Sequence, residues 1–352
     1  MDDALEFPFP EPPEPGRLRP VAPGVFWLRM PLPFKLDHIN LWLLEDGDGW
    51  TAVDAGFPSD ETRALWGQLL AGDAAGRPVK RLIVTHFHPD HFGLSDMFTE
   101  EFGLPLLMTR EEWLTGRLLS LTSDEEYVEG QGALFRKHGL AEDRLATLRQ
   151  VGNAYAKRVG GRLPSRYHRI RDGETLEIGG RAWHVVVGHG HAPEHATLYC
   201  DSLGVLISGD QILPKISPNI SSVWFEPDAD PLGEYLNALA GFRPLPRTTL
   251  VLPSHRLPFH GLHQRLDSLA AHHEERLERI RTAVAEATMS AFELLPHLFK
   301  IKLDTHHLTF AMGEAIAHCE YLAQRGDINR FTAEGVVRYT AVKRLTAQAF
   351  RL

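Results

Sequence analysis

Four apolar runs in this chain each lead into residues that can bind a metal ion, and this pattern constrains the fold most. The endings are His86, His88, Asp90 and His91 after RLIVT; His189 and His191 after WHVVVG; Gly209 and Asp210 after GVLIS; and Ser254 and His255 after TTLVLP. Short β-branched runs predict strands. In open α/β sheets, functional groups gather beyond the carboxyl ends of the strands. We therefore expect an α/β fold in which four sequence-distant clusters meet at one sheet edge.

The densest of these clusters is THFHPDH, with three histidines and one aspartate. A single histidine after a strand is usually a hydrogen-bonded surface residue, and a short motif alone is a weak signal. Here three more clusters follow in register, so the pattern favours a metal site. Because Pro89 stiffens the turn, we expect Asp90 and His91 to point to a different metal ion from His86 and His88.

The donor types available in the chain restrict the chemistry of this site. The two cysteines, Cys200 and Cys319, are too few for a disulfide framework or a cysteine-based zinc site. Imidazole nitrogen and carboxylate oxygen bind a divalent ion at about 2.0–2.2 Å, and two ions roughly 3.5–4 Å apart can share a bridging carboxylate. Asp210 is placed to be that bridge, since Gly209 lets the backbone come close. Zinc suits this donor set, with manganese and iron as alternatives.

The sequence also predicts how the chain is organised. Residues 1–21 form an extended arm, since six of the first twenty residues are proline. Residues 22–262 form the α/β domain, which begins with a β pair at 25–32 and 39–46. The chain lacks an apolar stretch of the roughly 18 residues that a membrane span needs, and its start has no secretory pattern. We expect a cytoplasmic protein.

Two parts of the chain have helical periodicity instead. Residues 109–160 are expected to be a helical insertion, in which Thr109 and Glu112 fit a capping box. Residues 263–352 carry three helical patterns and a closing strand at 335–342, which together predict a small winged-helix-like module.

In this order, the motifs THFHPDH, GHAPEH, SGD and PSH resemble the metallo-β-lactamase superfamily, and VDAG at 53–56 matches its early strand-end motif. The resemblance covers roughly residues 22–262 and implies an αββα four-layer sandwich with a dinuclear site. The tail is similar to that of the glyoxalase II-like and β-lactamase-like hydrolases of this superfamily, whose C-terminal module is winged-helix-like.

The resemblance assigns the site residues by matching position. The first metal ion would be held by His86, His88 and His191, the second by Asp90, His91 and His255, with Asp210 bridging both. Asp54 would orient ligands by hydrogen bonds. Four further residues would support the ligands or face the substrate, namely His195, Lys215, Asn219 and Trp224. The remaining histidines are expected to be ordinary surface or core residues that bind neither metal nor substrate. They are His38, His138, His168, His184, His260, His263, His272, His273, His297, His306, His307 and His318.

The expected reaction is hydrolysis. Two divalent cations, for which zinc is the preferred choice, lower the pKa of a water molecule bound to them from 15.7 toward about 7. The bridging hydroxide would attack the substrate, with Asp90 and Asp210 as the catalytic carboxylates. The resemblance implies a thioester or related acyl ester, as in hydroxyacylglutathione hydrolases.

A single-strand-specific endoribonuclease and a non-catalytic binding protein are the alternatives. The chain has a net charge of −9, and residues 263–352 hold 12 Lys plus Arg against 11 Asp plus Glu, which leaves +1. Nucleic-acid binding wants a clearly basic surface. Only 44 residues separate Asp210 from His255, too few for the extra domain of RNA-processing relatives. We therefore expect a small-molecule acyl substrate and neither nucleic acid nor membrane as partner, with a homodimer left open.

Overall fold

The computed structural model describes residues 5–160, 163–300 and 305–342. The chain divides into two compact units. The first, here called the sandwich unit, comprises Met1–Tyr127, Asn153–Pro218 and Glu234–Ala270; the second, the helical unit, comprises Val128–Gly152, Asn219–Gly233 and Ala271–Leu352. Among the described residues, none of the helices is long and apolar enough to cross a membrane.

The first sheet of the sandwich unit has seven strands in sequential order. They are β1 (Arg19–Ala22), β2 (Val25–Pro31), β3 (His38–Asp46), β4 (Gly49–Val53), β5 (Val79–Ile83), β6 (Leu106–Met108) and β7 (His168–Arg169). Strands β1 to β4 pair antiparallel and β4 to β7 pair parallel. The expected β pair at the start of this domain is therefore confirmed as β2 and β3.

The second sheet has five strands in the order β12-β11-β10-β9-β8. They are β8 (Thr175–Ile178), β9 (Arg181–Gly188), β10 (His195–Cys200), β11 (Val205–Gly209) and β12 (Leu250–Pro253). Strands β8 to β11 pair antiparallel, and β11 and β12 pair parallel.

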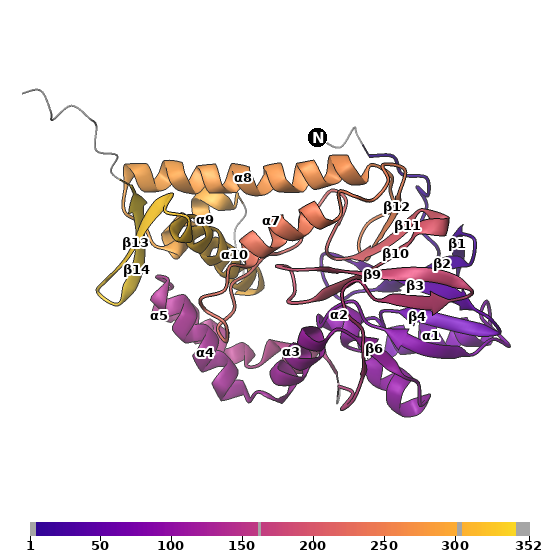
Figure 1. Ribbon diagram of the computed structural model, residues 1–352. Coiled ribbons are helices and arrows are strands. Elements are labelled where there is room, and N and C mark those ends of the chain that lie inside the picture. The colour runs from indigo at the N-terminus through magenta and orange to yellow at the C-terminus, as the bar shows by residue number, and fades with distance from the viewer. Residues whose placement is uncertain (1–4, 161–162, 301–304, 343–352) are drawn as a thin grey trace, which may run out of the picture. The chain divides into compact units, whose positions relative to one another are not determined.

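The core of the sandwich unit lies between the two sheets. Trp27 and Trp42 of the first sheet belong to the same buried cluster as Trp183, Leu198 and Ile207 of the second. Large aromatic side chains bury about 150–250 Å² each, so this layer supplies much of the stability. Helix α1 lies outside the first sheet and α7 lies outside the second (Figure 1). The four layers form the αββα sandwich that the motifs imply.

Helices follow or interrupt these strands along the chain. Their bounds are α1 (Asp60–Ala71), α2 (Pro89–Phe92), a π-helix (Met97–Glu101), α3 (Arg110–Leu121), α4 (Asp124–Lys137), α5 (Glu142–Val151), α6 (Ala154–Arg158), a 3₁₀ helix (Asp201–Leu203), α7 (Pro231–Gly241) and α8 (Leu262–Glu286). The insertion expected at 109–160 is helical, as α3 to α6. Its predicted capping box is wrong, because the Thr109 side chain makes no cap hydrogen bond and Glu112 bonds to distant loops instead.

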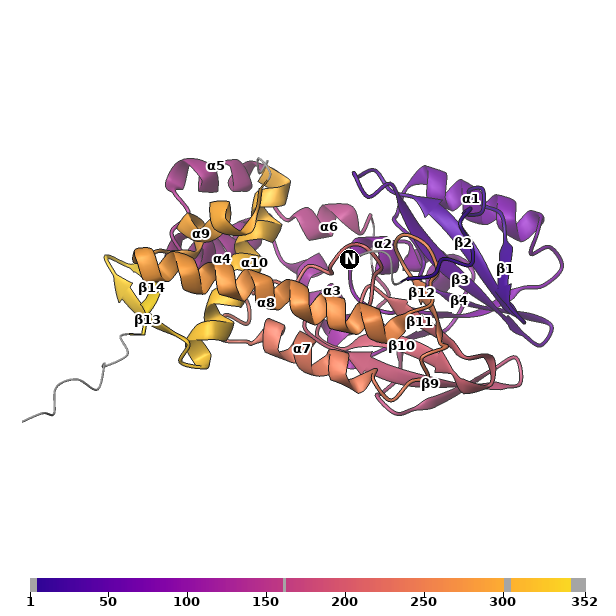
Figure 2. The same ribbon diagram turned by 90° about the horizontal axis from the view of Figure 1, so that it is seen from above.

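The helical unit contains most of α4, all of α5 and the later part of α8. It also contains α9 (Ala291–Leu298), α10 (Thr305–Gln324) and the hairpin β13 (Ile328–Ala333) and β14 (Val336–Ala341). Helices α9 and α10 lie beside the end of α8 in both views (Figures 1 and 2). Ser290 and Glu293 form a complete capping box at the start of α9. Three helices and a hairpin thus follow one another in the expected order.

Candidate metal centre

The candidate ligands follow strands of both sheets. His86 and His88 lie in the loop between β5 and α2, and His191 follows β9. Asp210 directly follows β11, and His255 comes two residues after β12. The last residue of each of these strands is buried, so the strand end fixes where the next residues can point.

The structure brings all seven predicted ligands into two groups. Within each group, one ligand atom from every residue lies within 4.8 Å of the others; the groups are His86, His88, His191 and Asp210, and Asp90, His91 and His255. Asp210 lies between them. Its Oδ2 is 3.6 Å from Nε2 of His191 and 3.4 Å from Nε2 of His255, and its Oδ1 is 3.6 Å from Nε2 of His91.

These residues fit a divalent cation. Nε2 of His91 and Oδ1 of Asp210 are buried and make no hydrogen bond to any described residue. A buried polar atom left without a partner costs about 1–3 kcal/mol. The separations of 3.4–3.6 Å are long for hydrogen bonds, yet they suit two donors that share an ion at about 2.0–2.2 Å. The donor set and its unsatisfied atoms therefore match a metal centre.

Asp54 holds the ring of His91 in place. Its Oδ2 lies 2.8 Å from Nδ1 of His91, and its Oδ1 accepts a hydrogen bond from the backbone N–H of Thr85 at 2.7 Å. A carboxylate bound to Nδ1 leaves Nε2 of the ring for a metal ion. Asp54 reaches this position with a left-handed backbone, at φ 65°. The arrangement is the one expected of a residue that orients a ligand.

His195 supports Asp210. Its Nε2 accepts a hydrogen bond from the backbone N–H of Asp210 at 3.0 Å, and its ring stacks on His86 with centroids 4.6 Å apart. Gly209 makes this contact possible, because a Cβ at that position would collide with the His195 ring. The neighbouring His189 is bonded elsewhere, with Nδ1 at 2.6 Å from the carbonyl oxygen of Pro193.

The histidines of the two ligand groups differ in protonation: His86 and His88 favour the neutral imidazole, whereas His255 favours the protonated form. Burial lowers the pKa of His88 to about 3 and that of His86 well below its usual value, so these imidazoles offer lone pairs. Burial also acts on His255, but the carboxylates of Asp210 and Asp90 outweigh it and raise its pKa to about 10. A cation among these carboxylates would take the place of that proton.

Glu112 is a site residue that the sequence did not reveal. Its side chain is fully buried, and it accepts hydrogen bonds from the backbone N–H groups of Phe87 (2.9 Å) and Glu194 (2.7 Å). Phe87 stands between two ligands, and Glu194 is the third residue after His191. One carboxyl group therefore ties two ligand loops together. The only sequence signal was the fit to a capping box, which suggests a local partner instead.

Three residues expected to face the substrate have other contacts. Lys215 is exposed in the sandwich unit, and its ammonium lies 5.0 Å from the centre of the Phe7 ring. Asn219 and Trp224 belong to the helical unit, where Asn219 donates to Oε2 of Glu314 at 3.3 Å. Their role toward a substrate stays a prediction.

Comparison with known proteins places the chain in a family. Residues 35–255 match the model described as the metallo-beta-lactamase superfamily. The chain belongs to the metallo-β-lactamase superfamily. Residues 277–342 also match a domain described as metallo-beta-lactamase-like, C-terminal. The predicted class, a metallo-hydrolase of this superfamily, is confirmed at this level.

Several proteins of this superfamily resemble the chain over nearly its whole length. A beta-lactamase domain protein from Burkholderia ambifaria is 44% identical, with 96% of this chain and 98% of that chain covered and a TM-score of 0.89. A metallo-beta-lactamase family protein from Thermus thermophilus is 31% identical, with 92% and 100% covered and a TM-score of 0.77. The probable metallo-hydrolase YqjP from Bacillus subtilis (strain 168) is 26% identical over 91% of this chain and 98% of its own length.

Proposed function

We propose that this metallo-hydrolase cleaves thioesters or related acyl esters at a dinuclear zinc centre. The observation that carries the proposal is the position of Asp210, whose carboxylate oxygens lie within 3.6 Å of imidazoles from both ligand groups. A carboxylate so placed suits a pair of ions that share it. When bound, the ions would supply an activated water and polarise the acyl carbonyl.

The chain's own residues would position the reactants and move protons. Asp90 has the most exposed carboxylate of the ligand set, at 20% of its side chain against 10% for Asp210. It can therefore reach a water molecule on the open side of the centre. Once the acyl group is attacked, this carboxylate is placed to pass the proton toward the leaving thiol. Asp54 and His195 keep His91 and Asp210 from turning during this step.

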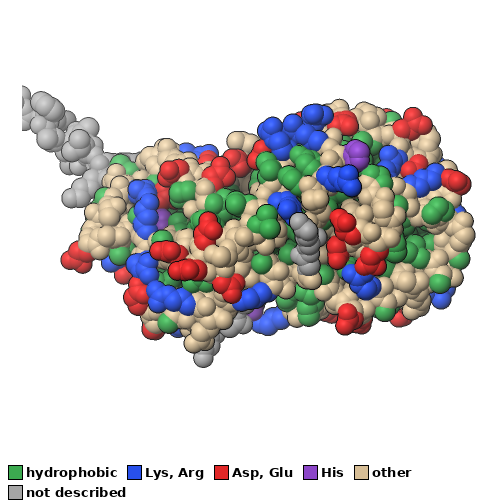
Figure 3. Space-filling model, turned by 90° about the horizontal axis from the view of Figure 1, so that it is seen from below, with side chains coloured by type: hydrophobic (Ala, Val, Ile, Leu, Met, Phe, Trp, Pro, Cys, Tyr) green, Lys and Arg blue, Asp and Glu red, His purple; other side chains and the backbone are tan. Residues whose placement is uncertain are grey.

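The charge distribution supports a small acyl substrate over a nucleic acid. The net charge is −9, and acidic and basic side chains are interspersed on the face drawn in Figure 3. A protein that grips a nucleic-acid strand usually gathers Lys and Arg on one face. The endoribonuclease alternative is therefore the weaker one.

A substrate panel tests the proposal. Purified protein, reconstituted with zinc and analysed for metal content, would be offered acyl-glutathione, acyl-CoA, a lactone and single-stranded RNA. We expect about two zinc ions at this centre and thiol release that is insensitive to moderate salt. RNA cleavage alone, with a steep salt dependence, would overturn the assignment in favour of the nuclease. Full metal occupancy without turnover of any substrate would instead favour a binding protein.

Substitution of Asp90 separates its two roles. Asp90→Asn keeps the size of the side chain and removes its charge, so we expect thiol release to fall more than zinc content does. Asp48→Asn is the matched control, because Asp48 is an exposed aspartate of the sandwich unit that pairs with Lys80 and, among the described residues, makes no contact with the ligand loops. A variant at Asp90 with wild-type turnover would exclude the proton-transfer role.

A further inference from the structure

The helical unit holds a third group of metal-ligand side chains, in addition to the two of the metal centre. It consists of His273 on α8 and of Glu314 and His318 on α10, whose candidate ligand atoms lie within 4.8 Å of one another. The two imidazoles are fully buried and Glu314 is 6% exposed. Burying such groups costs free energy unless they satisfy one another or hold an ion.

Helix α10 fixes the direction of the His318 ring. Its Nδ1 lies 2.7 Å from the backbone carbonyl oxygen of Glu314, one turn earlier. Because a carbonyl oxygen only accepts, Nδ1 carries the proton and Nε2 presents a lone pair. Histidines that bind metal ions are commonly oriented by such a bond. The lone pair points to His273, whose Nδ1 is 3.0 Å away.

This close approach of two imidazole nitrogens has two interpretations. Nδ1 of His273 donates a hydrogen bond to His318, or both nitrogens present lone pairs to one cation. Burial lowers the pKa of His273 to about 2 and that of His318 to about 3, so both rings are neutral near pH 7. The same approach, at 2.9 Å, occurs between His86 and His88 in the metal centre. The second interpretation therefore has a precedent in this chain.

We propose that His273, Glu314 and His318 form a structural site for one zinc-like divalent ion in the helical unit. Two histidines and one glutamate are a donor set that proteins use for zinc. Glu314 and His318 are four residues apart and so share one face of α10, while His273 reaches them from α8. The bound ion would join these two helices.

Arg276 sets how tightly this site binds. Its guanidinium pairs with Glu314 and also lies 5.0 Å from the centre of the Phe299 ring. Asn219 donates to the other carboxylate oxygen of Glu314. Each carboxylate oxygen has two lone pairs, so the group can accept these bonds and still bind an ion. Because the guanidinium charge repels a cation, we expect weaker binding here than in the metal centre.

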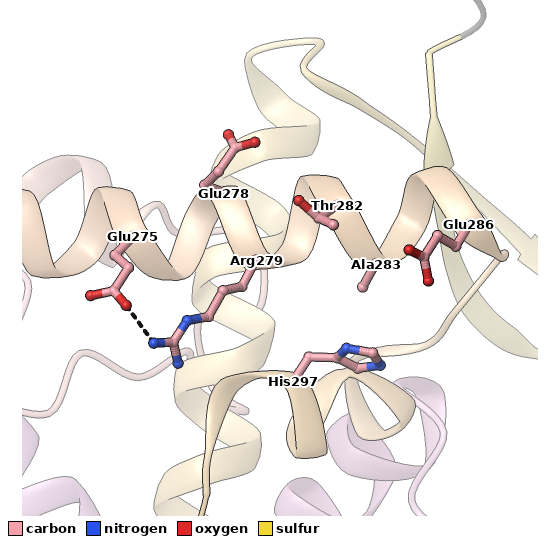
Figure 4. A pocket seen from close by; sticks show the side chains of 7 residues that line it. All are labelled: Glu275, Glu278, Arg279, Thr282, Ala283, Glu286 and His297. Carbon is pink, nitrogen blue, oxygen red and sulfur yellow. Dashed lines mark hydrogen bonds and ion pairs between the residues drawn. The ribbon is translucent and has the colours of Figure 1, made fainter.

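The exposed side of α8 offers a contrasting feature. A pocket there is lined by Glu275, Glu278, Arg279, Thr282, Ala283, Glu286 and His297 (Figure 4). Glu275 is already paired with Arg279, and the glutamates are exposed to solvent. Exposed acidic groups are well solvated and gain little from an ion. The buried side of the helix is therefore the better candidate.

Metal analysis of the full-length protein tests the site. The protein would be stripped with a chelator, reloaded with zinc and counted after gel filtration. We expect His318→Gln to hold one zinc equivalent fewer than the wild type, with unchanged hydrolase turnover. His272→Gln removes the neighbouring histidine of the same helix and should hold as much zinc as the wild type. Equal zinc in folded His318→Gln and wild type would overturn the proposal, whatever number of ions the metal centre holds.

Arg276→Gln provides a second test, which keeps all three ligands. Without the guanidinium charge we expect zinc to bind this site at least about tenfold more tightly, measured against a competing chelator after the metal centre is saturated. Added zinc should then raise the melting temperature of Arg276→Gln more than that of the wild type. If neither protein binds zinc beyond the metal centre, the cluster is a hydrogen-bonded polar group without an ion and the proposal is wrong.

Discussion

Substitution of Glu112 would measure how much its hydrogen bonds to the two ligand loops contribute to the free energy of unfolding. Its two carboxyl oxygens accept hydrogen bonds from the buried backbone N–H groups of Phe87 and Glu194. Removing the side chain leaves both donors without an acceptor, at about 1–3 kcal/mol each. Glu112→Ala should therefore lower the free energy of unfolding by about 2–6 kcal/mol. That is a large share of the about 5–15 kcal/mol that a typical protein has.

Glu112→Gln gives a graded version of the same change. The amide keeps one acceptor oxygen, but its NH₂ group faces a backbone N–H, so one hydrogen bond is lost. We expect a loss of about 1–3 kcal/mol, smaller than for Glu112→Ala. Glu111→Gln is the matched control, because the side chain of Glu111 is partly exposed and pairs with the neighbouring Arg110. It should change stability by less than about 0.5 kcal/mol.

Urea denaturation measures these differences, and zinc content and turnover measure their effect on the centre. We expect both Glu112 variants to lose zinc more readily than the control, since the loops of His86, His88 and His191 are no longer joined. If Glu112→Gln matches Glu111→Gln in stability and in zinc affinity, the reasoning from the two hydrogen bonds is refuted.

The same residue predicts a pH dependence. Burial raises the pKa of Glu112 from 4.5 to about 8. Between these values the folded chain keeps a proton that the unfolded chain releases. Stability therefore falls as pH rises through this window, by up to about 1.4 kcal/mol per pH unit. Glu112→Gln cannot ionise, so its deficit relative to the wild type should shrink as the pH rises from 4.5 to 8.

Three further outcomes are expected. Asp210→Asn should lower turnover more than about 100-fold and reduce zinc content, because loss of even an outer partner of a ligand costs about 10–100-fold; full zinc and full turnover would exclude the bridging role. Gly209→Ala should lower the melting temperature, since its Cβ meets the His195 ring at a φ of 53°; Gly241→Ala, where nothing lies within 4 Å, is the control. Burial lowers the pKa of His138 from 6.5 to about 3, so the wild type should lose stability as pH falls through this range, and His138→Gln should lose less over the same range, as followed by denaturation at each pH.

The sequence locates most of the candidate ligands because they stand close to strand ends, although Asp90 and His91 lie on the short helix α2. A strand end is a fixed point, so a residue such as Asp210 or His255 has little freedom once the sheets have formed. The order of the motifs along the chain, through the family resemblance, then assigns each ligand to one of the two metal ions. The β2–β3 pair could be predicted because its two apolar runs are close in sequence, and the sandwich was implied by the family resemblance.

Residues that act across long distances were hidden from the sequence. Glu112 contacts backbone groups 25 and 82 residues away. His273 and His318 meet across 45 residues of separation, on helices whose pairing has no local signature. Each of these side chains also has a plausible local role, as a cap or as a core histidine. For Glu112 the fold contradicts the local interpretation, because its carboxyl group bonds to distant backbone groups. For His273 and His318 the interpretation as core histidines stays open until zinc binding is measured.

Because the ligands come from both sheets, metal binding affects the stability and the abundance of the protein. His86 follows a strand of the first sheet, whereas His191, Asp210 and His255 follow strands of the second. An ion among them therefore fastens the two sheets along one edge, and a thousandfold excess over its dissociation constant adds about 4.1 kcal/mol to folding. Metal-starved chains should open along this edge first and become accessible to proteases. The abundance of the protein, and not merely its activity, would then follow the supply of metal.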